Sequence, residues 1–407
     1  MNLQLYKSTI KSNKQIAITG SKSESNRLLL LQALYPSVNI ENLSNSDDSQ
    51  LMQKALNSSN KIIDIHHAGT AMRFLTAFYS TQANRKVELT GSKRMKERPI
   101  AILVDALKQI GADISYKENE GFPPLIIKGK QLTGNKVTLK ANVSSQYISA
   151  LLLIAPKLEN GLKLTLEGTI TSIPYIKMTL NLLSQIGVES SFKDNVITVK
   201  PLLNIKENKN LVVESDWSSA SYFYSIIALS KIGTSVTISS YKKESLQGDS
   251  VLAEIYKAFG VSTEFNNNSV IISKTSEAKS IKELNLQEAP DIAQTIAVTA
   301  FGLGLSCYLT GLHTLKIKET DRLVALKTEI EKLGGNVIIT NDSLTLEASD
   351  SILENIEIET YNDHRMAMAF APLALKTDII IQDYKVVSKS YPTFWEDLKI
   401  LGFNFPL

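Results

Sequence analysis

The chain has 407 residues, more than one hydrophobic core usually supports, so two domains are expected. Its hydrophobic fraction of 43% and charged fraction of 21% are typical of globular proteins and exclude a disordered or collagen-like chain. A net charge of +3, from 44 basic and 41 acidic residues, argues against a dedicated nucleic-acid binder. One cysteine and four histidines exclude a disulfide framework and leave little for a metal site.

The N-terminal residues, Met1 to Lys14, lack the apolar core of a signal peptide. The longest uncharged run, Ile292 to Leu315, is long enough to cross a bilayer. It contains polar residues and glycines, however, and the internal repeat described below divides it into a helix and a strand. We therefore expect a cytoplasmic protein that does not contact a membrane.

One layout repeats along the chain: a β-rich run, a turn, a polar motif and a helix. The β-rich runs are Gln15–Gly20, Lys86–Gly91, Lys163–Gly168, Ser235–Ser240, Ser306–Gly311 and Asp378–Asp383. Their ends lie 71 to 77 residues apart. This period predicts six βαβ-containing subdomains, three in each domain, with a divide near Asn204–Asn210.

Two further markers recur with the same period. Helical patterns end in glycine, which is typical of a helix C-cap, at Gly111, Gly187, Gly260, Gly334 and Gly402. A second helix is predicted to open at Gly69, Ser144, Ser218, Asp291 and His364.

The polar motifs just before the predicted helices are unusually rich in cations. Only seven of the 44 basic residues are arginines, and six of those seven lie in such motifs. A single serine there could be an ordinary N-cap, and a single lysine could be an ordinary solvated side chain. Cations are nevertheless disfavoured at a helix N-terminus, so the set predicts a substrate with several phosphate or carboxylate groups. The cations are Lys22, Arg27, Arg98, Lys318, Arg322, Arg365 and Lys389.

Acids and bases accompany these cations. Asp291 heads an apolar helix, Glu319 lies in the run Lys318–Arg322, and His364 heads another apolar helix. Such groups suit proton transfer. Cys307 lies in a strand pattern and is expected to be a buried, inert thiol. Gly20–Ser23 has the wrong spacing for a P-loop, and no G-x-G-x-x-G motif opens a βαβ unit.

Four stretches together are highly specific: Gly69–Arg73, Arg94–Pro99, Lys318–Arg322 and Tyr361–Met368. On these stretches the chain resembles the 5-enolpyruvylshikimate-3-phosphate (EPSP) synthase family of enolpyruvyl transferases, also called 3-phosphoshikimate 1-carboxyvinyltransferases. The similarity extends from Gly20 to about Phe394.

The resemblance implies an α/β fold of two domains. Each domain would have three βαβαββ repeat units around a pseudo-threefold axis, an inside-out α/β barrel. The chain would cross between the domains twice, so that residues 1–18 and 214–407 form one domain and residues 19–213 the other. The family's active site lies in the cleft between the domains.

The resemblance also implies a reaction. The enolpyruvyl group of phosphoenolpyruvate would pass to the 5-hydroxyl of shikimate 3-phosphate, with release of phosphate, by addition and elimination through a tetrahedral intermediate. No metal or organic cofactor would take part. We expect a monomer in the shikimate pathway whose partners are these two small molecules and not nucleic acid.

The implied site residues fall into three groups. The catalytic residues would be Lys22, Asp291 as the base for the 5-hydroxyl, Glu319 as the acid for the methylene carbon, and His364 in support. Shikimate 3-phosphate would be bound by Lys22, Ser23, Arg27, Ser144, Ser145, Gln146, Ser172, Tyr175, Asp291 and Lys318. Phosphoenolpyruvate would be bound by Lys22, Gly69, Arg98, Gln146, Arg322, Arg365 and Lys389.

Three positions depart from the family's common pattern. His67 and Thr314 each stand where asparagine is common, and Phe74 stands where proline is common after Arg73. Phe74 is expected to alter the packing of the helix that carries Gly69, and with it the affinity for phosphoenolpyruvate and for the inhibitor glyphosate.

Two other functions stay open. One is the related transfer of enolpyruvyl to UDP-N-acetylglucosamine, although that enzyme normally has a cysteine in a mobile loop. The other is a catalytically silent scaffold that binds anions. Loss of Lys22, Asp291, Glu319 or Arg365 would favour the scaffold, and all four are present.

Overall fold

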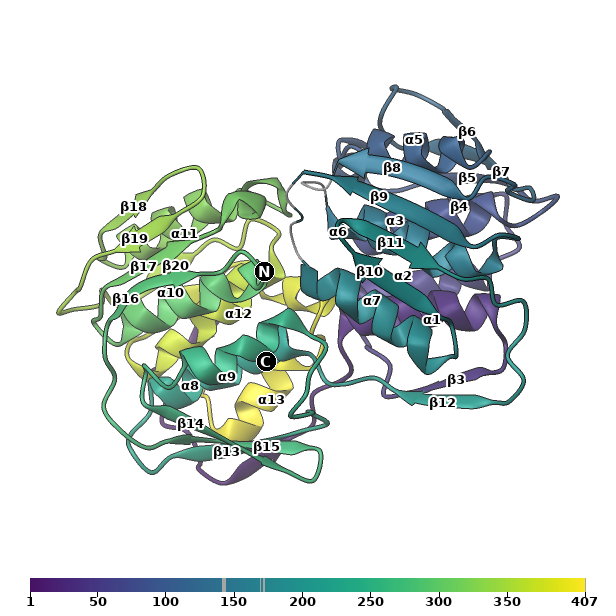
Figure 1. Cartoon of the computed structure of the whole chain (residues 1–407). Helices are drawn as coiled ribbons and strands as arrows, with labels where there is room; N and C mark the ends of the chain where they lie inside the picture. Colours follow the sequence, from purple (N-terminus) through teal and green to yellow (C-terminus); the bar gives the residue numbers. More distant parts are fainter. Residues whose placement is uncertain (141–143, 169, 171–172, 407) are drawn as a thin grey trace. The chain divides into compact units, whose positions relative to one another are not determined.

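The computed structural model describes residues 1–140, 144–168, 170 and 173–406. The chain forms two compact units (Figure 1). The first unit consists of Met1–Thr19 and Glu214–Leu407, and the second unit consists of Gly20–Val213. The chain therefore passes from one unit to the other twice, after Thr19 and after Val213.

The described residues of the second unit form three sheets. The first has the strand order β4-β5-β7-β6: β4 Ile62–Asp64, β5 Lys86–Thr90, β7 Leu125–Lys128 and β6 Asp113–Tyr116. The second has the order β10-β11-β9-β8: β10 Ser190–Lys193, β11 Val196–Val199, β9 Leu162–Glu167 and β8 Lys136–Lys140. The third pairs β12 Lys209–Val212 with β3 Val38–Glu41 in parallel.

Helices connect these strands. They are α1 Lys22–Leu34, α2 Asp47–Leu56, α3 Gly69–Ser80, α4 Lys93–Lys96, α5 Ala101–Gln109, α6 Ser145–Ile154, the 3-10 helix η1 Ala155–Lys157, and α7 Ile173–Gln185. In each four-stranded sheet two parallel strands come first and an antiparallel hairpin follows, with helices between. The order along the chain is therefore βαβαββ.

The first unit repeats this plan. One sheet has the order β14-β15-β13-β2: β14 Val261–Asn266, β15 Ser269–Lys274, β13 Ser235–Ser239 and β2 Lys14–Ile16. The next has the order β16-β17-β19-β18: β16 Ile281–Asn285, β17 Cys307–Thr310, β19 Leu344–Leu346 and β18 Val337–Ile339. The last has the order β1-β21-β20: β1 Leu3–Leu5, β21 Ile379–Ile381 and β20 Ile356–Ile358.

The first unit has both α-helices and short 3-10 helices. The α-helices are α8 Trp217–Ala228, α9 Leu252–Ile255, α10 Ala293–Gly302, α11 Arg322–Lys332, α12 His364–Phe370 and α13 Phe394–Leu401. The 3-10 helices are η2 Gly248–Val251, η3 Pro290–Ile292, η4 His313–Ile317, η5 Ala371–Leu375 and η6 Tyr384–Lys389.

Three helices pack together at the centre of each unit, and the sheets lie outside them. In the second unit α1, α3 and α6 contact one another, and in the first unit α8, α10 and α12 do so (Figure 1). Every residue of α3, α10 and α12 is buried. A helix that is apolar on all sides must be buried. The long uncharged run at Ile292 to Leu315 contains such a helix, α10, followed by the strand β17, as the repeat predicts. No helix in the described part of the chain is long and apolar enough to cross a membrane.

The five glycines predicted to end helices all have positive φ values, from 73° at Gly260 to 102° at Gly402. Four of them, Gly111, Gly187, Gly334 and Gly402, lie at or just after the ends of α5, α7, α11 and α13, as expected, whereas Gly260 lies four residues beyond Tyr256, the C-cap of α9. One of the six β-rich runs, however, was assigned to the wrong place in the repeat. Five of the runs form the second strand of a repeat, whereas Gln15–Gly20 contributes to β2, a first strand that pairs with β13. The strand of the second unit that corresponds to the other five runs is β3. It is short and half-polar, and no hairpin lies beside it.

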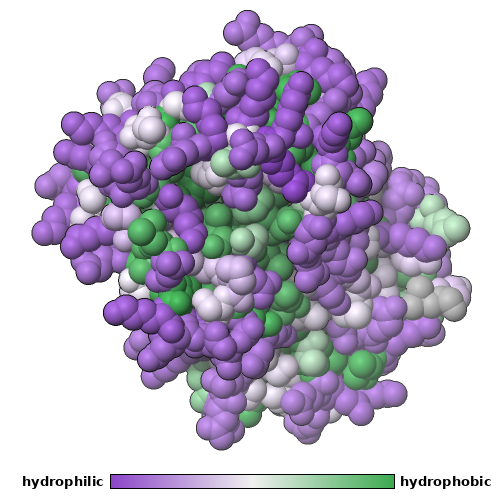
Figure 2. Space-filling view, turned by 90° about the vertical axis from the view of Figure 1, so that its right-hand side faces the viewer, coloured by the Kyte–Doolittle hydropathy of each residue, from purple (hydrophilic) through white to green (hydrophobic). Residues whose placement is uncertain are grey.

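The face shown in Figure 2 is mostly hydrophilic, with apolar residues exposed between the polar ones. The polar cover agrees with a composition in which lysine supplies most of the positive charge. The residues of chemical interest lie instead at the ends of the central helices.

Candidate active site

The predicted site residues gather at the N-termini of the central helices in both units. Lys22 is the first residue of α1, Gly69 the first of α3, and Ser144 the N-cap of α6. In the first unit, Asp291 lies in η3 just before α10, and His364 is the first residue of α12. Free N–H groups and the positive end of the helix dipole favour anions at these places.

A guanidinium lies against the N-terminus of α3. A Cβ atom on Gly69 would stand 2.6 Å from Nη1 of Arg98, so only glycine leaves room for that side chain. Arg73 donates from Nη1 to the Gly69 carbonyl at 3.1 Å. Burial, followed by the charge of Arg98, lowers the pKa of Arg73 to about 10. Two cations and a helix N-terminus thus meet at one point, which suits an anionic ligand.

Gln146 connects this point to α6. Its Nε2 donates to Oγ1 of Thr70 on α3 at 3.1 Å. Ser144 caps α6 by accepting from the Gln146 backbone N–H at 3.4 Å, and Ser145 is buried in the first turn. The predicted residues Gly69, Arg98, Ser144, Ser145 and Gln146 therefore belong to α3, α6 and the loop before α5.

Arg27 is buried in the second unit, with 2% of its surface exposed. It donates to three neutral acceptors: Nε to Thr179 Oγ1 at 2.8 Å, Nη1 to the Ser23 carbonyl at 2.7 Å, and Nη2 to Ser149 Oγ at 2.9 Å. Burial lowers the pKa of Arg27 to about 10.

Two aromatic rings lie beside the Arg27 guanidinium. Its Cζ is 5.4 Å from the ring centroid of Phe74 and 5.8 Å from that of Tyr175. Phe74, one of the three departures, thus packs against a predicted binding residue as well as within α3. Rings at this distance stabilise a cation through their negative faces.

Lys22 lies near a carboxylate that was not among the predicted site residues. Its Nζ is 3.9 Å from Oδ2 of Asp48 in α2. The signal was present in the sequence as the acidic pair Asp47 and Asp48, which begins α2. Ser172 lies outside the described residues.

Asp291 is the centre of the cluster in the first unit. Its Oδ1 accepts from Nη1 of Arg322 at 2.9 Å and lies 3.4 Å from Nζ of Lys318. Its Oδ2 lies 3.2 Å from Nη2 of Arg365. Three cations therefore surround one carboxylate and fix the directions of both of its oxygens.

Arg322 binds three carboxylates at once. Nε donates to Asp363 Oδ2 at 2.7 Å, Nη1 to Asp291 Oδ1 at 2.9 Å, and Nη2 to Glu319 Oε2 at 2.8 Å. Burial alone would lower the pKa of Arg322, but the three carboxylates raise it above its ordinary value. The planar guanidinium thereby fixes the predicted base and the predicted acid relative to each other.

Ser218 and Asp249 extend the cluster behind Arg365. Ser218 Oγ donates to Oδ2 of Asp249 and accepts from Nη2 of Arg365 at 3.3 Å. Burial first, and then the charge of Asp291, raise the pKa of Asp249 to about 7. Both residues lie in polar motifs before predicted helices, and that was the only signal that could have selected them.

His364 contacts Asp363, and Lys389 contacts the preceding residue, Asn362. His364 is 2% exposed, and its Nδ1 is 3.9 Å from Oδ1 of Asp363. Lys389, at the end of η6, donates from Nζ to the Asn362 carbonyl at 2.6 Å. Thr314, the third departure, has a buried hydroxyl with no hydrogen-bond partner among the described residues.

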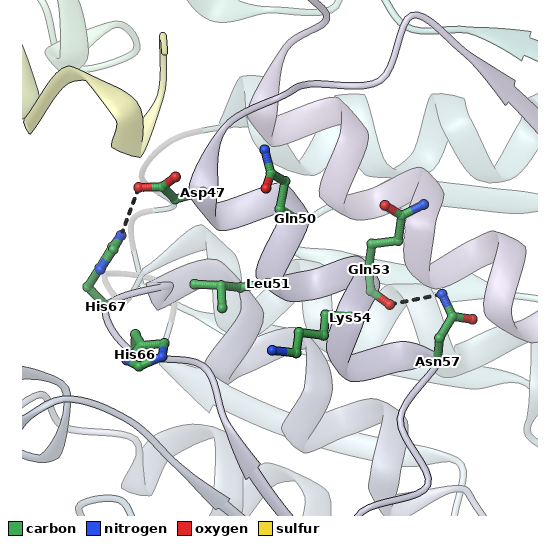
Figure 3. Close-up of a pocket in the computed structure, with 8 residues that line it drawn as sticks. All are labelled: Asp47, Gln50, Leu51, Gln53, Lys54, Asn57, His66 and His67. Carbon is green, nitrogen blue, oxygen red and sulfur yellow. Dashed lines mark hydrogen bonds and ion pairs between the residues drawn. The ribbon is translucent and has the colours of Figure 1, made fainter. Parts of the chain in front are cut away.

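The second unit also has a cavity of about 830 Å³, drawn in Figure 3. It is lined by Asp47, Gln50, Leu51, Gln53, Lys54, Asn57, His66 and His67. His67 points toward Asp47, with Nε2 4.0 Å from Oδ2. None of the predicted site residues is among those lining residues, although His67 is one of the three departures and Asp47 is the neighbour of Asp48. Within the described ranges, no group of three His, Cys, Asp or Glu residues is arranged to hold a metal ion.

Comparisons with known proteins agree on one family. A family model described as EPSP synthase (3-phosphoshikimate 1-carboxyvinyltransferase) matches residues 53–398. The chain is 47% identical over 394 residues to a 3-phosphoshikimate 1-carboxyvinyltransferase of Bacteroides fragilis, covering 96% of this chain and 95% of that protein. It is 37% identical over 420 residues to the enzyme of the same name from Colwellia psychrerythraea, with 95% and 96% covered.

Solved structures match over the whole chain. EPSP synthase from Acinetobacter baumannii has a TM-score of 0.81 at 21% identity, with 100% of this chain and 99% of that chain covered. The enolpyruvyl transferase NikO from Streptomyces tendae has a TM-score of 0.73 at 12% identity, with 100% and 98% covered. These matches confirm the predicted fold class.

Proposed function

Since this chain belongs to the EPSP synthase family, we propose that it transfers the enolpyruvyl group of phosphoenolpyruvate to the 5-hydroxyl of shikimate 3-phosphate and releases phosphate. The family resemblance predicted from the sequence is thereby confirmed. The structural observation that carries the proposal is the cluster in which Arg322 binds Asp291 and Glu319 together while Lys318 and Arg365 flank Asp291.

That cluster suits a reaction that needs one base and one acid. Asp291 takes the proton of the 5-hydroxyl while the hydroxyl oxygen forms a bond to C2 of phosphoenolpyruvate. Glu319 delivers a proton to the methylene carbon, which gives the tetrahedral intermediate. Glu319, now a carboxylate, takes back a methyl proton while phosphate leaves with the proton held by Asp291, which restores the double bond. Arg322 supports both steps because it holds the two carboxylates in a fixed relation.

The cations suit two substrates that repel each other. Phosphoenolpyruvate and shikimate 3-phosphate both carry phosphate and carboxylate groups. Fixed cations and helix N-termini stabilise such charge without reorganising during the reaction. Arg98 beside Gly69 and Arg73 is an arrangement of this kind in the second unit, and Arg365 beside Asp291 is one in the first.

We assign the remaining residues by the same proposal. Shikimate 3-phosphate is bound by Lys22, Ser23, Arg27, Ser144, Ser145, Gln146, Ser172, Tyr175, Asp291 and Lys318. Phosphoenolpyruvate is bound by Lys22, Gly69, Arg98, Gln146, Arg322, Arg365 and Lys389. His364 supports the proton transfers, and the assigned residues of both units serve the same reaction. All three nitrogens of Arg27 and of Arg322 already donate hydrogen bonds within the protein, which supports roles in which these guanidiniums orient their neighbours as well as any ligand.

We further propose that the protein is a cytoplasmic monomer of two domains. It works without a metal or organic cofactor. The family resemblance is the support for these points. Size-exclusion chromatography with light scattering would test the monomer, since a mass well above 44.9 kDa would contradict it.

The function itself is tested by phosphate release from the purified protein. Phosphoenolpyruvate is supplied with shikimate 3-phosphate, and a parallel reaction contains UDP-N-acetylglucosamine instead. Release that requires shikimate 3-phosphate is the expected result. Release only with UDP-N-acetylglucosamine, or with neither acceptor from folded protein, would contradict the proposal.

A further inference from the structure

Two consecutive residues before α12, Tyr361 and Asn362, have left-handed backbones, with φ values of 51° and 56°. Asparagine tolerates this region, but a tyrosine there is uncommon because its Cβ crowds the backbone. Such a conformation persists only where the surroundings hold it in place, and it is often found at functional sites.

The strained pair directs several groups of the site. The Asn362 carbonyl accepts from Nζ of Lys389 at 2.6 Å. The next residue, Asp363, accepts from Nε of Arg322 through one oxygen and from the backbone N–H of Arg365 through the other, at 2.7 and 2.9 Å. The three cations proposed to bind phosphoenolpyruvate in the first unit therefore all depend on the path of the chain at 362–363.

The group that holds this path is Glu329, a fully buried carboxylate on α11. Its Oε1 accepts from the hydroxyl of Tyr361 at 2.6 Å, and its Oε2 accepts from the backbone N–H of Glu359 at 3.1 Å. Lys332 donates to both oxygens, at 2.9 and 2.8 Å, and balances the charge.

Arg322 and Glu329 lie seven residues apart on the same helix. That spacing is two turns, so both side chains leave α11 on one face. Arg322 binds Asp363 and Glu329 binds Tyr361 and Glu359, so the helix contacts the segment 359–363 at two separate points. Two attachments define the direction of a short segment, whereas one would allow it to swing.

We propose that Glu329 and the hydroxyl of Tyr361 are positioning residues for phosphoenolpyruvate binding: they hold Tyr361 and Asn362 in the left-handed conformation that aims Arg365 and Lys389. The inference rests on the proposed function. Neither residue touches a reacting group, so their effect passes through the backbone at 362–363.

The test is Tyr361→Phe, which removes one hydroxyl and keeps the ring. We expect KM for phosphoenolpyruvate to rise about tenfold, as for one lost buried hydrogen bond, and KM for shikimate 3-phosphate to stay within about twofold. Glu329→Gln retains an acceptor for Tyr361 and should have a smaller effect than Glu329→Ala.

Tyr224→Phe is the matched control. Its hydroxyl is also partly buried and bonded, to Oγ1 of Thr263 at 2.8 Å, in the same unit but on α8. Hydrogen exchange of the peptide 359–370 gives a readout that needs no activity, since the amides of Asp363 and Arg365 are bonded within the segment. Exchange there should speed up in Tyr361→Phe and stay unchanged in Tyr224→Phe.

The outcomes are distinct. A rise in KM for phosphoenolpyruvate alone, with faster exchange at 359–370, supports the inference. An equal rise for both substrates, or a loss of stability with unchanged KM and exchange, overturns it and leaves Tyr361 a structural residue. Wild-type protein that releases no phosphate would overturn the proposed function, whatever the variants do.

Discussion

At the scale of single residues, the orientation of the Asp291 carboxylate is set by the three cations around it. A carboxylate held by Lys318, Arg322 and Arg365 has both oxygens directed before any substrate arrives. We predict that Asp291→Asn lowers kcat by about 10²–10⁴-fold, the usual contribution of a general base, because the amide cannot accept the 5-hydroxyl proton. Steady-state phosphate release measures kcat, and calorimetry measures binding of the two substrates.

Asp113→Asn is the control for that change, because Asp113 forms an exposed pair with Lys128. It should leave kcat unchanged. A turnover close to wild type in Asp291→Asn would show that another group is the base.

The ionisation of Asp249 makes the stability of the protein depend on pH. Its pKa, raised to about 7 by burial and Asp291, lies above the ordinary value of 3.8, so the folded protein binds a proton that the unfolded chain releases. The contribution of Asp249 to stability is therefore complete below about pH 4 and is lost as the pH rises toward 7. We predict that Asp249→Asn removes this loss. Between pH 5 and pH 8 the unfolding free energy of the variant should therefore rise by a few kcal/mol relative to that of wild type.

Urea midpoints at the two pH values measure that difference. Asp397→Asn is a comparison, because burial also raises the pKa of Asp397, outside the cluster described here. Equal pH dependence of wild type and Asp249→Asn would mean that Asp249 is ionised in the fold.

At the scale of elements, the N-termini of the central helices carry the chemistry. At α3 the absence of a side chain on Gly69 lets Arg98 lie against the first turn. We predict that Gly69→Ala raises KM for phosphoenolpyruvate by roughly tenfold, since the new Cβ displaces the guanidinium. The unfolding free energy should change by less than about 1 kcal/mol, because a flexible side chain can move away and alanine suits a helix.

Substrate kinetics together with urea unfolding would check Gly69→Ala. A large loss of stability with an unchanged KM would mean that the helix, and not Arg98, gives way. Arg98→Lys should reproduce the kinetic effect, because lysine lacks the planar fork.

At the scale of the whole molecule, the chain crosses between the units at two peptides, and Gly20 begins the second unit. A Cβ on Gly20 would stand 1.9 Å from the Asn42 carbonyl oxygen and 2.7 Å from Cγ1 of Val213, so the backbone would have to shift. We predict that Gly20→Ala lowers the stability of the second unit by about 1–3 kcal/mol, the range for overpacking.

The two tryptophans, Trp217 and Trp395, make this prediction specific, because both lie in the first unit. In Gly20→Ala the urea midpoint of unfolding measured by circular dichroism should be lower than in wild type. The midpoint measured by tryptophan fluorescence should be unchanged. If both transitions shift together, the chain unfolds as one cooperative unit.

Much of the fold could be predicted because each repeat has local markers. Helix-ending glycines such as Gly111 and Gly334 and the β-rich runs have chemistry that acts over a few residues. The phase of the repeat was misjudged at Gln15–Gly20, because β2 finds its partner β13 more than 200 residues later. The structure also shows Glu329 beside Tyr361, a proximity that sequence spacing does not predict.

The sequence by itself determined the family, the repeat of six βαβ-containing units and the concentration of cations and acids before helices, because composition, period and motif spacing are properties of the chain alone. Only the tertiary structure decided which charges neutralise one another. Arg322 could have faced any of several carboxylates, and its choice of Asp291, Glu319 and Asp363 follows from burial. A buried charge must find partners at hydrogen-bond distance, and the packing of α10, α11 and α12 selects which partners those are.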